Sequence, residues 1–507
     1  MNIQVVWFKR DLRIEDHAPL AAAAEKGAVI PLYIVEPSLV TAPDFDQLHY
    51  TFIQESIESL SEDLTNLGAP LILRVGEAVD VFQQLYDRIH FTTIWSHIET
   101  GNHLTYERDR AVASWAADRG IGWTEMRQQG VVRGVLDRNR WQKQWEAFMT
   151  QPPAKTPKQL TAVSEIAEAP MPDAEELGIA EHLAAVPARE TDLTGGSSQA
   201  HRWLTSFLDG RGADYAKAMS SPLTAYDNCS RLSPYLAWGC VSMRSVVHAL
   251  RDKQAELRAL KEAERKTAPM NLKALKSFDA RLHWHCHFIQ KLEAEPDIEF
   301  RCFNRLCDQL RTQPDDWNEE YYQAWIEGRT GYPFVDACMR ALQTRGWINF
   351  RMRAMLVSFA AYDLWLDWRR IKDFLACQFI DYEPGIHYSQ LQMQSGTTGI
   401  NTLRMYNPTK QGYDHDPEGT FIRTWVRELR DVPDLFIHTP HNAPRPPDNY
   451  PPPMVDHDKA IARARASFKS LRNTDGFREE ASRVYEKHGS RKRPSRRRTV
   501  ATSETTS

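Results

Sequence analysis

The run GRTGYPFVDACMRALQTRGWINFRMRAMLVSF, residues 328–359, decides the fold of the second half of the chain. Apolar residues recur in it at helical spacing, first from Val335 to Leu342 and then from Met352 to Phe359. A Gly-Tyr-Pro sequence precedes the first segment, and Gly346 separates the two. These signals predict a buried pair of helices.

Charged residues lie inside and just after this apolar pair. Arg351 and Arg353 stand among core-like residues, and Asp381, Glu383 and His387 follow a further aromatic-rich helix. Burying a charge costs free energy unless the charge is paired or used on a ligand. A structural Arg–Asp pair explains any one of these residues, whereas the whole set indicates a buried polar ligand.

The first 130 residues alternate short apolar runs with amphipathic stretches. This pattern predicts a parallel, doubly wound α/β sheet, which binds ligands beyond the carboxyl ends of its strands. No GxGxxG follows the first run, so a nicotinamide dinucleotide site is not expected. The predicted strands are IQVVWF (3–8), AVIPLYIVE (28–36), PLILRV (70–75) and FTTIWSH (91–97).

The rest of the chain divides by composition. Residues 131–198 are rich in Pro, Ala and acidic residues and predict an interdomain linker. Residues 199–486 show helical periodicity without strand signals, so a large all-helical domain should follow the α/β domain of residues 1–130. Residues 487–507 are basic and then Ser/Thr-rich, which predicts a disordered tail that is either solubilising or attracted to DNA phosphates.

Bulk composition restricts the class of protein. The 507 residues are 42% hydrophobic and 26% charged, which is typical of a soluble globular protein with two or more domains. The net charge of −4 means that any DNA contact must be a local basic surface. Seven cysteines without a CxxC pattern, no membrane-spanning apolar run and no secretory signal predict a cytoplasmic protein, which we expect to be monomeric and away from membranes.

The segment NCSRLSPYLAWG, residues 228–239, carries an anion-binding pattern. Ser233 followed by Pro234 is typical of the N-cap and first position of a helix. Such a helix start is usually only a cap. With Ser230 and Arg231 just before it, we predict a phosphate site.

Three histidines lie in the segment FDARLHWHCHFIQKL, residues 278–292. On a helix, His283 and His287 share a face, while His285 points to nearly the opposite side. A zinc site with two histidines is an alternative, but no acidic third ligand is near, so we predict no metal.

These segments together resemble the cryptochrome/DNA photolyase family. The resemblance runs from about Met1 to about Tyr450 and implies an α/β domain that can hold an antenna pigment, followed by a helical domain that binds FAD. The motifs that carry it are WFKRDLRIEDHAPL, CSRLSPYLAWGCVS, GRTGYPFVDACMRAL, GWINFRMR, DWRR and YNPTKQGYDHDPEGTFIRTWVRELRDVP, in the order of the family.

The resemblance implies contacts to FAD. The loop 230–233 and an upstream tyrosine grip the pyrophosphate, and the other residues surround the flavin ring, where Glu383 replaces an Asp and His387 stands at an Asn that faces N5. The implied cofactor residues are Tyr215, Ser230, Arg231, Leu232, Ser233, His285, Arg353, Asp381, Glu383 and His387.

The resemblance also implies contacts to a damaged base. Trp284 falls on an aromatic residue that stacks on the lesion, and Arg281 replaces a lesion-contacting Glu. Met393 stands at a Trp, Ala354 at a Met and Phe350 at an Asn, so the lesion pocket has been rebuilt. The implied DNA or lesion residues are Arg281, Trp284, Trp347, Arg351 and Met393.

Tryptophans that reduce the photoexcited flavin are a further family feature. Trp368 matches the middle member of the chain, and Trp317 or Trp325 could be the outer one. Leu391 stands at the inner position, where Tyr388 or a displaced Trp could substitute. The residues predicted to take part in the chemistry are Trp284, Trp368 and His387.

A second, antenna chromophore of unknown identity is also implied. The segment HIETGNHLTYERD, residues 97–109, lies where many members contact a folate. Only Glu107 matches that site in kind, and Tyr106 stands where Asn is usual. A purely structural α/β domain is the alternative.

Three functions are compatible with this pattern. In the first, a photolyase-type lyase, light-excited reduced FAD donates an electron to a pyrimidine lesion flipped out of DNA. In the second, a cryptochrome-type photoreceptor signals through a protein partner, and in the third a flavoprotein acts in the dark. Arg281, Ala354 and Met393 count against repair, and Leu391 counts against a sensor that uses the usual tryptophans. We rank repair first.

Overall fold

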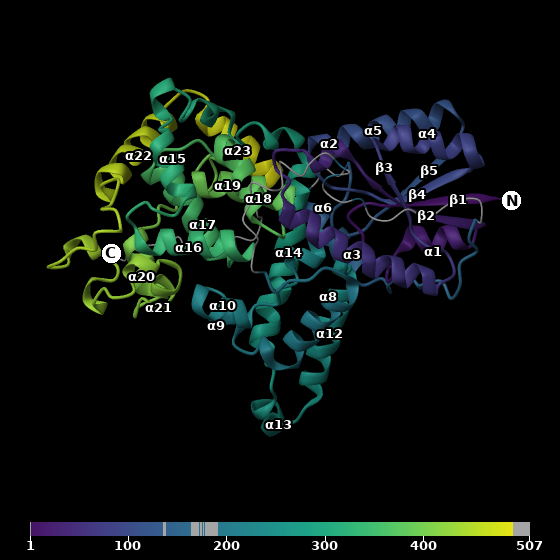
Figure 1. The fold of residues 1–507 in the computed structure, drawn as a ribbon, viewed down its shortest axis with the longest axis horizontal. Helices are drawn as coiled ribbons and strands as arrows, with labels where there is room; N and C mark the ends of the chain where they lie inside the picture. Colours follow the sequence, from purple (N-terminus) through teal and green to yellow (C-terminus); the bar gives the residue numbers. More distant parts are fainter. Residues whose placement is uncertain are drawn as a thin grey trace, which may run out of the picture.

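The computed structural model describes residues 2–134, 138–163, 172, 175, 177 and 191–489. Figure 1 shows an α/β unit, which carries the N-terminus, beside a larger helical unit made from the later part of the chain. The predicted fold class, a doubly wound α/β unit followed by a mostly helical one, is confirmed. The boundaries at residues 130, 198 and 486 stay predictions, and the tail from residue 490 lies outside the described residues.

The sheet of the α/β unit has five parallel strands in the order β3-β2-β1-β4-β5. Four of them were predicted. The edge strand β5 was missed because it is only partly buried and contains no apolar run. The strands are β1 (Ile3–Phe8), β2 (Ala28–Val35), β3 (Ile72–Val75), β4 (Thr93–His97) and β5 (Gly122–Met126).

Helices cover both faces of this sheet (Figure 1). Alternate residues of β1 point to opposite faces, so Val6 and Phe8 join one hydrophobic cluster while Val5 and Trp7 join another. The helices of this unit are α1 (Ala18–Ala24), α2 (Pro37–Val40), α3 (Gln47–Asn66), α4 (Ala78–Ile89) and α5 (His103–Asp118).

The helical unit contains no strand among described residues 191–489. Helix α6 (Arg138–Met149) precedes it and packs against α12. Its α-helices are α8 (Ser197–Ser206), α9 (Tyr215–Ala218), α10 (Pro222–Asn228), α11 (Ser233–Ala237), α12 (Met243–Ala259), α13 (Glu262–Thr267), α14 (Leu272–Ala294), α15 (Glu319–Ile326), α16 (Pro333–Arg345), α17 (Phe350–Ser358), α18 (Trp368–Gln378), α19 (Pro384–Ser395), α20 (Pro408–His415), α21 (Thr420–Trp425), α22 (His457–Arg472) and α23 (Phe477–His488).

The predicted buried pair is the helices α16 and α17. Gly346 ends α16 with φ 68°, a left-handed conformation that favours glycine. A Cβ atom there would lie 2.6 Å from Cδ2 of Leu48 on α3, so this turn also seats the helical unit against the α/β unit. No helix in the described part of the chain is both long enough and apolar enough to cross a membrane.

The two units share a polar interface and a core. After β1, Arg13 Nη1 donates to the carbonyl of Gly239 at 2.8 Å, and Asp16 accepts from Arg244 and from the hydroxyl of Ser242. One hydrophobic cluster runs from Phe8 and the α3 helix into α11, α12 and α14. The α/β unit and the helical unit therefore share one hydrophobic core where they meet.

Candidate functional site

An ion pair between α17 and the loop after α18 anchors the site. Arg353 Nη1 and Nη2 donate to the two carboxylate oxygens of Asp381, each at 2.9 Å. The same guanidinium donates from Nε to the carbonyl of Ile348 at 2.7 Å. Two parallel charge-assisted hydrogen bonds fix the orientation of both side chains.

Two buried polar groups lie near this pair. His285 on α14 lies close enough to Asp381 to feel its charge, and Glu383 lies at the start of α19. Burial lowers the pKa of His285 to about 4 and raises the pKa of Glu383 to about 7. Arg10, from the loop after β1, approaches Glu383 with Nη2–Oε2 3.9 Å and donates to the carbonyl of Ala237 at 2.9 Å.

His387 on α19 has a defined tautomer. Its Nε2 lies 2.9 Å from the carbonyl oxygen of Lys372, which can only accept a hydrogen bond. Burial lowers the pKa of His387 to about 4, so the ring is neutral near pH 7. Nε2 therefore carries the proton, and Nδ1 keeps a lone pair that accepts.

We call the region bounded by His285, Arg353, Asp381, Glu383 and His387 the chamber, and unpartnered polar atoms indicate which ligand could bind there. His285 Nδ1, Glu383 Oε1 and Asn349 Oδ1 are buried and have no hydrogen-bond partner. Buried polar atoms in native proteins are almost always paired, so these three fit a ligand with both donors and acceptors. The isoalloxazine ring, which was predicted here, has that chemistry.

The loop 228–233 forms the second part of the site. Arg211 donates to the carbonyls of Asp227, Cys229 and Ser230, so these three oxygens all point toward the same guanidinium. Arg231 has φ 62°, and the next residue, Leu232, is right-handed helical. Successive N–H groups in such an alternation make a concave anion site, so the loop fits a phosphate.

The predicted capping role of Ser233 is wrong. Helix α11 begins at Ser233, with Leu232 as its N-cap and without a side-chain cap. The Ser233 hydroxyl instead accepts from the indole of Trp347 at 3.4 Å. This contact joins the loop to the turn that leads to Asn349 and Arg353.

The Arg231 side chain belongs to a group of contacting aromatic rings and guanidinium groups, which we call the cation–π ladder. Its guanidinium lies 4.2 Å from the Trp347 ring and 3.8 Å from the Tyr226 ring. On the other side of Tyr226 lies Arg345, at 4.1 Å, which also contacts Trp425 at 5.1 Å. Arg231 is only 1% exposed and also reaches Asp192 at 3.3 Å.

The predicted cofactor residues thus form two groups. His285, Arg353, Asp381, Glu383 and His387 lie around the chamber, and the loop 230–233 lies with Tyr215. The segment 347–353 joins them through Ser233, through Arg353 and through Asn349, which donates to the carbonyl of Met219 at 3.0 Å. Their roles toward FAD stay predictions.

The predicted lesion residues are less uniform. Trp284 is 37% exposed on α14, and Arg351 lies at the start of α17 with a buried, unpartnered Nε. Trp347 is buried in the cation–π ladder, and Met393 is half-buried on α19. Arg281 is exposed and lies next to Tyr215 and Cys229.

The predicted electron route has a gap in the structure. Trp368 is buried, and its indole donates to the Cys302 sulfur at 3.5 Å. Leu391 is buried in the same hydrophobic cluster. The Tyr388 hydroxyl lies 3.2 Å from that of Tyr382, so a tyrosine pair rather than an indole lies in this part of α19.

Arg370 and a row of rings mark the outer end of the tryptophan route. The Arg370 guanidinium lies 3.6 Å from the Trp317 ring, which lies 5.1 Å from Tyr322. Tyr322 in turn lies 6.5 Å from Trp325, which is fully buried. Of the two candidates, Trp317 is therefore the one with access to the surface.

A cavity lies at the carboxyl ends of β1 and β2 and is also lined by the segment after β4, so it borders the point between β1 and β4 where the strand order reverses. Its volume is about 110 Å³, and it also contacts the helical unit. Apolar and aromatic side chains, including Tyr33, Phe45, Tyr50, Ile53 and Trp238, form most of its wall. This cavity is the structural candidate for a second chromophore site.

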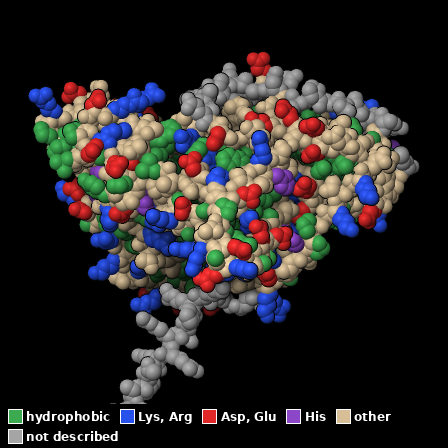
Figure 2. Space-filling view, turned by 90° about the horizontal axis from the view of Figure 1, so that it is seen from below, with side chains coloured by type: hydrophobic (Ala, Val, Ile, Leu, Met, Phe, Trp, Pro, Cys, Tyr) green, Lys and Arg blue, Asp and Glu red, His purple; other side chains and the backbone are tan. Residues whose placement is uncertain are grey.

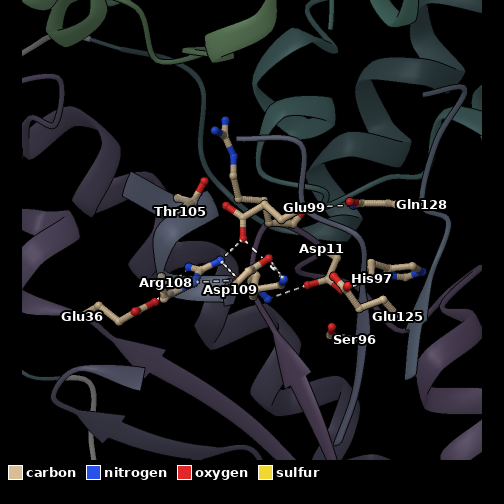
Figure 3. Close-up of polar contacts among 12 residues, drawn as sticks. Asp11, Glu36, Ser96, His97, Glu99, Thr105, Arg108, Asp109, Glu125 and Gln128 are labelled. Carbon is tan, nitrogen blue, oxygen red and sulfur yellow. Dashed lines mark hydrogen bonds and ion pairs between the residues drawn. The ribbon is translucent and has the colours of Figure 1, made fainter. Parts of the chain in front are cut away.

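An ionic cluster lines the polar end of this cavity (Figure 3). Arg108 Nη1 lies 3.0 Å from Glu36, and its Nη2 lies 2.8 Å from Asp109 and also bonds Glu99. Lys9 pairs with Asp109 at 3.0 Å. Three carboxylates therefore occupy both cations.

The folate-type contacts of segment 97–109 point elsewhere. Glu107 is exposed and pairs with Arg110 at 2.7 Å, while the Tyr106 hydroxyl donates to Glu293 of α14. Arg133 also bonds Glu293, at 3.1 Å. Protein contacts thus occupy Tyr106 and Glu107, while other residues of the same segment, among them Asn102, Leu104 and Thr105, line the cavity.

The pH dependence of stability should reveal the ionic cluster. Burial, opposed by Arg108, raises the pKa of Glu36 to about 7, and its Oε2 is buried without a partner. Because the raised pKa favours the protonated folded state, this stabilisation is full below about pH 4.5 and is lost as pH rises through 7. Between pH 5 and 8, the unfolding free energy of the wild type should fall by roughly 3 kcal/mol more than that of Glu36→Gln, because the variant has no carboxyl group to ionise there.

Urea denaturation at pH 5, 6.5 and 8 measures this effect. Glu25→Gln, which changes an exposed carboxylate at the end of α1, is the control and should keep the wild-type pH profile. Equal pH profiles for wild type and Glu36→Gln would contradict the assignment.

The structure shows the surroundings of His283 and His287, the two histidines considered as zinc ligands. His283 and His287 both contact the ring of Trp141, at 5.0 and 5.7 Å, and so belong to the core. Within the described residues, Asp11, His17 and His97 form the one cluster with metal-ligating spacing. Asp11 Oδ2 accepts from both imidazoles, at 3.0 and 2.7 Å, so hydrogen bonds account for this cluster.

Several site residues were not predicted from the sequence. Lys9 and Arg10 follow β1 directly, and Glu36 follows β2 directly. A charged residue immediately after a buried parallel strand lies at the ligand-binding edge of the sheet, so this signal was available. Asn349 and Arg211 gave no such signal. Only contacts with residues distant in the sequence bring them to the site, and these contacts leave no local sequence pattern.

Comparison with known proteins follows this geometry. Residues 4–149 match the DNA photolyase family, and residues 278–470 match the FAD binding domain of DNA photolyase. The deoxyribodipyrimidine photo-lyase of Halobacterium salinarum is 28% identical over 93% of this chain and 100% of its own. Cryptochrome-2 of Arabidopsis thaliana is 30% identical over 91% of this chain and 79% of its own.

A solved structure supports the same relationship. An archaeal photolyase from Sulfolobus tokodaii, whose crystal holds two FAD molecules and implies a novel light-harvesting cofactor, has a TM-score of 0.76 at 25% identity. The match covers 92% of this chain and 100% of that one. The chain therefore belongs to the cryptochrome/DNA photolyase family, and its helical unit contains an FAD-binding domain of the photolyase type.

Proposed function

We propose that this chain is a DNA photolyase that uses FAD and blue or near-ultraviolet light to split pyrimidine photolesions. The observation that carries the proposal is the exposed ring of Trp284. At 100° per residue, Trp284, Arg281 and His285 fall on one face of α14, so an exposed aromatic ring borders the chamber. A flipped-out base needs an aromatic surface of this kind to stack on.

The rim beside α17 supports DNA binding. The charge of Arg351 lowers the pKa of His415 on α20, so these helices meet, and the hydroxyl of Ser221 before α10 donates to the His415 carbonyl at 2.7 Å. Phe350 and Tyr413 on this rim are 48% and 49% exposed. Seen from below, the helical unit shows Lys and Arg side chains gathered beside hydrophobic ones (Figure 2).

Each predicted residue has a physical role in this proposal. Bound FAD would supply the light absorption and the electron. Trp284 stacks on the flipped base, and Arg351 binds a DNA phosphate. Arg353 and Asp381 orient the ring, and neutral His387 presents the acceptor Nδ1.

Photorepair tests the proposal. The protein, with its flavin chemically reduced to bypass Leu391, is illuminated with oligonucleotides that carry a cyclobutane dimer or a (6-4) product. We expect intact pyrimidines under light and none in darkness, and Trp284→Ala should lower the yield at least tenfold. Tyr485→Ala, another exposed aromatic residue on α23, should repair like wild type.

A photoreceptor is the second candidate. The departures at Arg281, Ala354 and Met393 favour it, because they fall among the residues implied for lesion contact. Absence of repair of either lesion by flavin-loaded protein would favour this function, with a protein partner.

We also propose that the cavity at β1 and β2 holds a second chromophore. Because Glu36, Glu99 and Asp109 occupy Arg108 and Lys9, this end of the cavity favours an uncharged aromatic heterocycle over one with a phosphate. The second FAD of the Sulfolobus tokodaii photolyase gives a precedent for two chromophores in one chain. Extraction and mass spectrometry of the bound chromophores would test this.

A further inference from the structure

The loop cation that was predicted to bind the FAD diphosphate is held by protein contacts through both of its terminal nitrogens, and only its buried Nε has no partner. The guanidinium of Arg231 contacts the rings of Trp347 and Tyr226 and donates to the Tyr226 carbonyl and to Asp192, each at 3.3 Å. Its side chain has no exposed surface. Moving it toward a ligand would break two cation–π contacts and its ion pair with Asp192, which would keep only the hydrogen bond from the Tyr226 hydroxyl.

A diphosphate at this loop needs a cation. The concave N–H groups after Ser230 supply hydrogen bonds, but a diphosphate ester carries two full negative charges near neutral pH. Hydrogen bonds from charged donors to phosphate are about twice as strong as those from neutral ones. Arg211 does not fill this role, because its donors are spent on the carbonyls of the loop and of Trp203.

Arg281 lies on α14 next to the same loop. Its positive charge opposes the rise that burial causes in the pKa of the Tyr215 hydroxyl and of the Cys229 thiol, so the guanidinium lies close to both groups. Its Nη2 also reaches the Met219 sulfur at 3.9 Å, a weak acceptor. No carboxylate in the described part of the chain forms an ion pair with it, so most of its five N–H donors remain available.

We infer that Arg281, not Arg231, is the cation that binds the FAD diphosphate in this chain. The Tyr215 hydroxyl and the loop N–H groups complete the set of donors around the phosphates. The positive residue on α14 is then a cofactor ligand rather than a lesion contact. The inference rests on the FAD site of the proposed function and does not depend on whether the protein repairs or senses.

Flavin affinity tests this inference without any catalytic assay. The full chain is stripped of flavin, checked for helix content by circular dichroism, and titrated with FAD and with riboflavin, which lacks the diphosphate. We expect Arg281→Gln to weaken FAD binding roughly 10- to 100-fold, the range for lost charge-assisted hydrogen bonds, and to leave riboflavin binding within twofold. Arg281→Lys should recover part of the loss, and added salt should weaken wild-type FAD binding more than that of Arg281→Gln.

A second pair of probes isolates the phosphates from the ring. Each is titrated as a competitor of FAD. The affinity of ADP should fall in Arg281→Gln, whereas the affinity of adenosine should not change. Arg258→Gln is the matched control, because it removes one exposed arginine charge on α12 and should bind like wild type.

Three results would overturn the inference. Equal losses for FAD and riboflavin would mean that Arg281 only supports the fold of the chamber. Unchanged affinity for both ligands would mean that another group binds the phosphates. Wild-type protein that binds neither ligand would overturn the proposed function as well, which separates the two failures.

Discussion

Asp381→Asn will release flavin and destabilise the helical unit. The substitution keeps the shape of the side chain but leaves Arg353 with a neutral partner in a half-buried site, where both of its terminal nitrogens now meet a carboxylate at 2.9 Å. Losing one partner of a buried pair costs up to about 3–5 kcal/mol, and partial exposure of Arg353 brings the expected loss to roughly 3 kcal/mol. We expect FAD affinity to fall about 100-fold, measured by flavin fluorescence.

A surface pair is the control for Asp381. Arg423 and Asp434 lie 2.6 Å apart, but the Asp434 side chain is largely exposed. Asp434→Asn should change the unfolding free energy by less than about 1 kcal/mol and leave flavin content unaltered. Full flavin occupancy in Asp381→Asn would contradict the assignment of this pair to the ring.

Arg231→Ala will collapse the cation–π ladder. It removes the guanidinium that contacts both the Trp347 and the Tyr226 ring and opens a cavity in a site where Arg231 is 1% exposed. We expect a loss of roughly 3–5 kcal/mol of unfolding free energy, from the cavity and from two lost cation–π contacts. Because the loop itself is displaced, FAD and riboflavin should both bind more weakly, unlike in Arg281→Gln.

Two further variants complete this comparison. Arg231→Lys should recover little, since an ammonium group does not stack on rings as a guanidinium does. Arg119→Ala removes an exposed arginine that lies 5.0 Å from the Trp115 ring and should cost no more than about 1 kcal/mol. Chemical denaturation compares the four proteins, and a loss below about 1 kcal/mol for Arg231→Ala would refute the structural role of the ladder.

The fold was predictable wherever neighbouring residues carry the signal. Buried runs gave four strands, and Gly346 gave the break between α16 and α17. Strand β5 was missed because an edge strand that is only partly buried needs no apolar run. The start of α11 was misplaced by one residue because Trp347, more than a hundred positions away, uses the Ser233 hydroxyl.

The site was predictable as a set but not in its geometry. Sequence reasoning placed Arg353 and Asp381 among charges that need a partner or a ligand, and in the structure these two pair with each other. It could not distinguish which of two arginines faces the phosphate loop, since the answer depends on rings contributed by Tyr226 and Trp347. Contacts of such sequence separation leave no periodic pattern.

The polar contacts that follow β1 set a schedule for synthesis on the ribosome. Arg10, Arg13 and Asp16 find their partners at Tyr382, Gly239 and Arg244, which are translated long after the sheet. At about 5–20 residues per second, Tyr382 emerges roughly 20–70 s after Arg10. Until Tyr382 emerges, Arg10 cannot make its hydrogen bond to the Tyr382 carbonyl, so the α/β unit completes its polar contacts to the helical unit only late in synthesis.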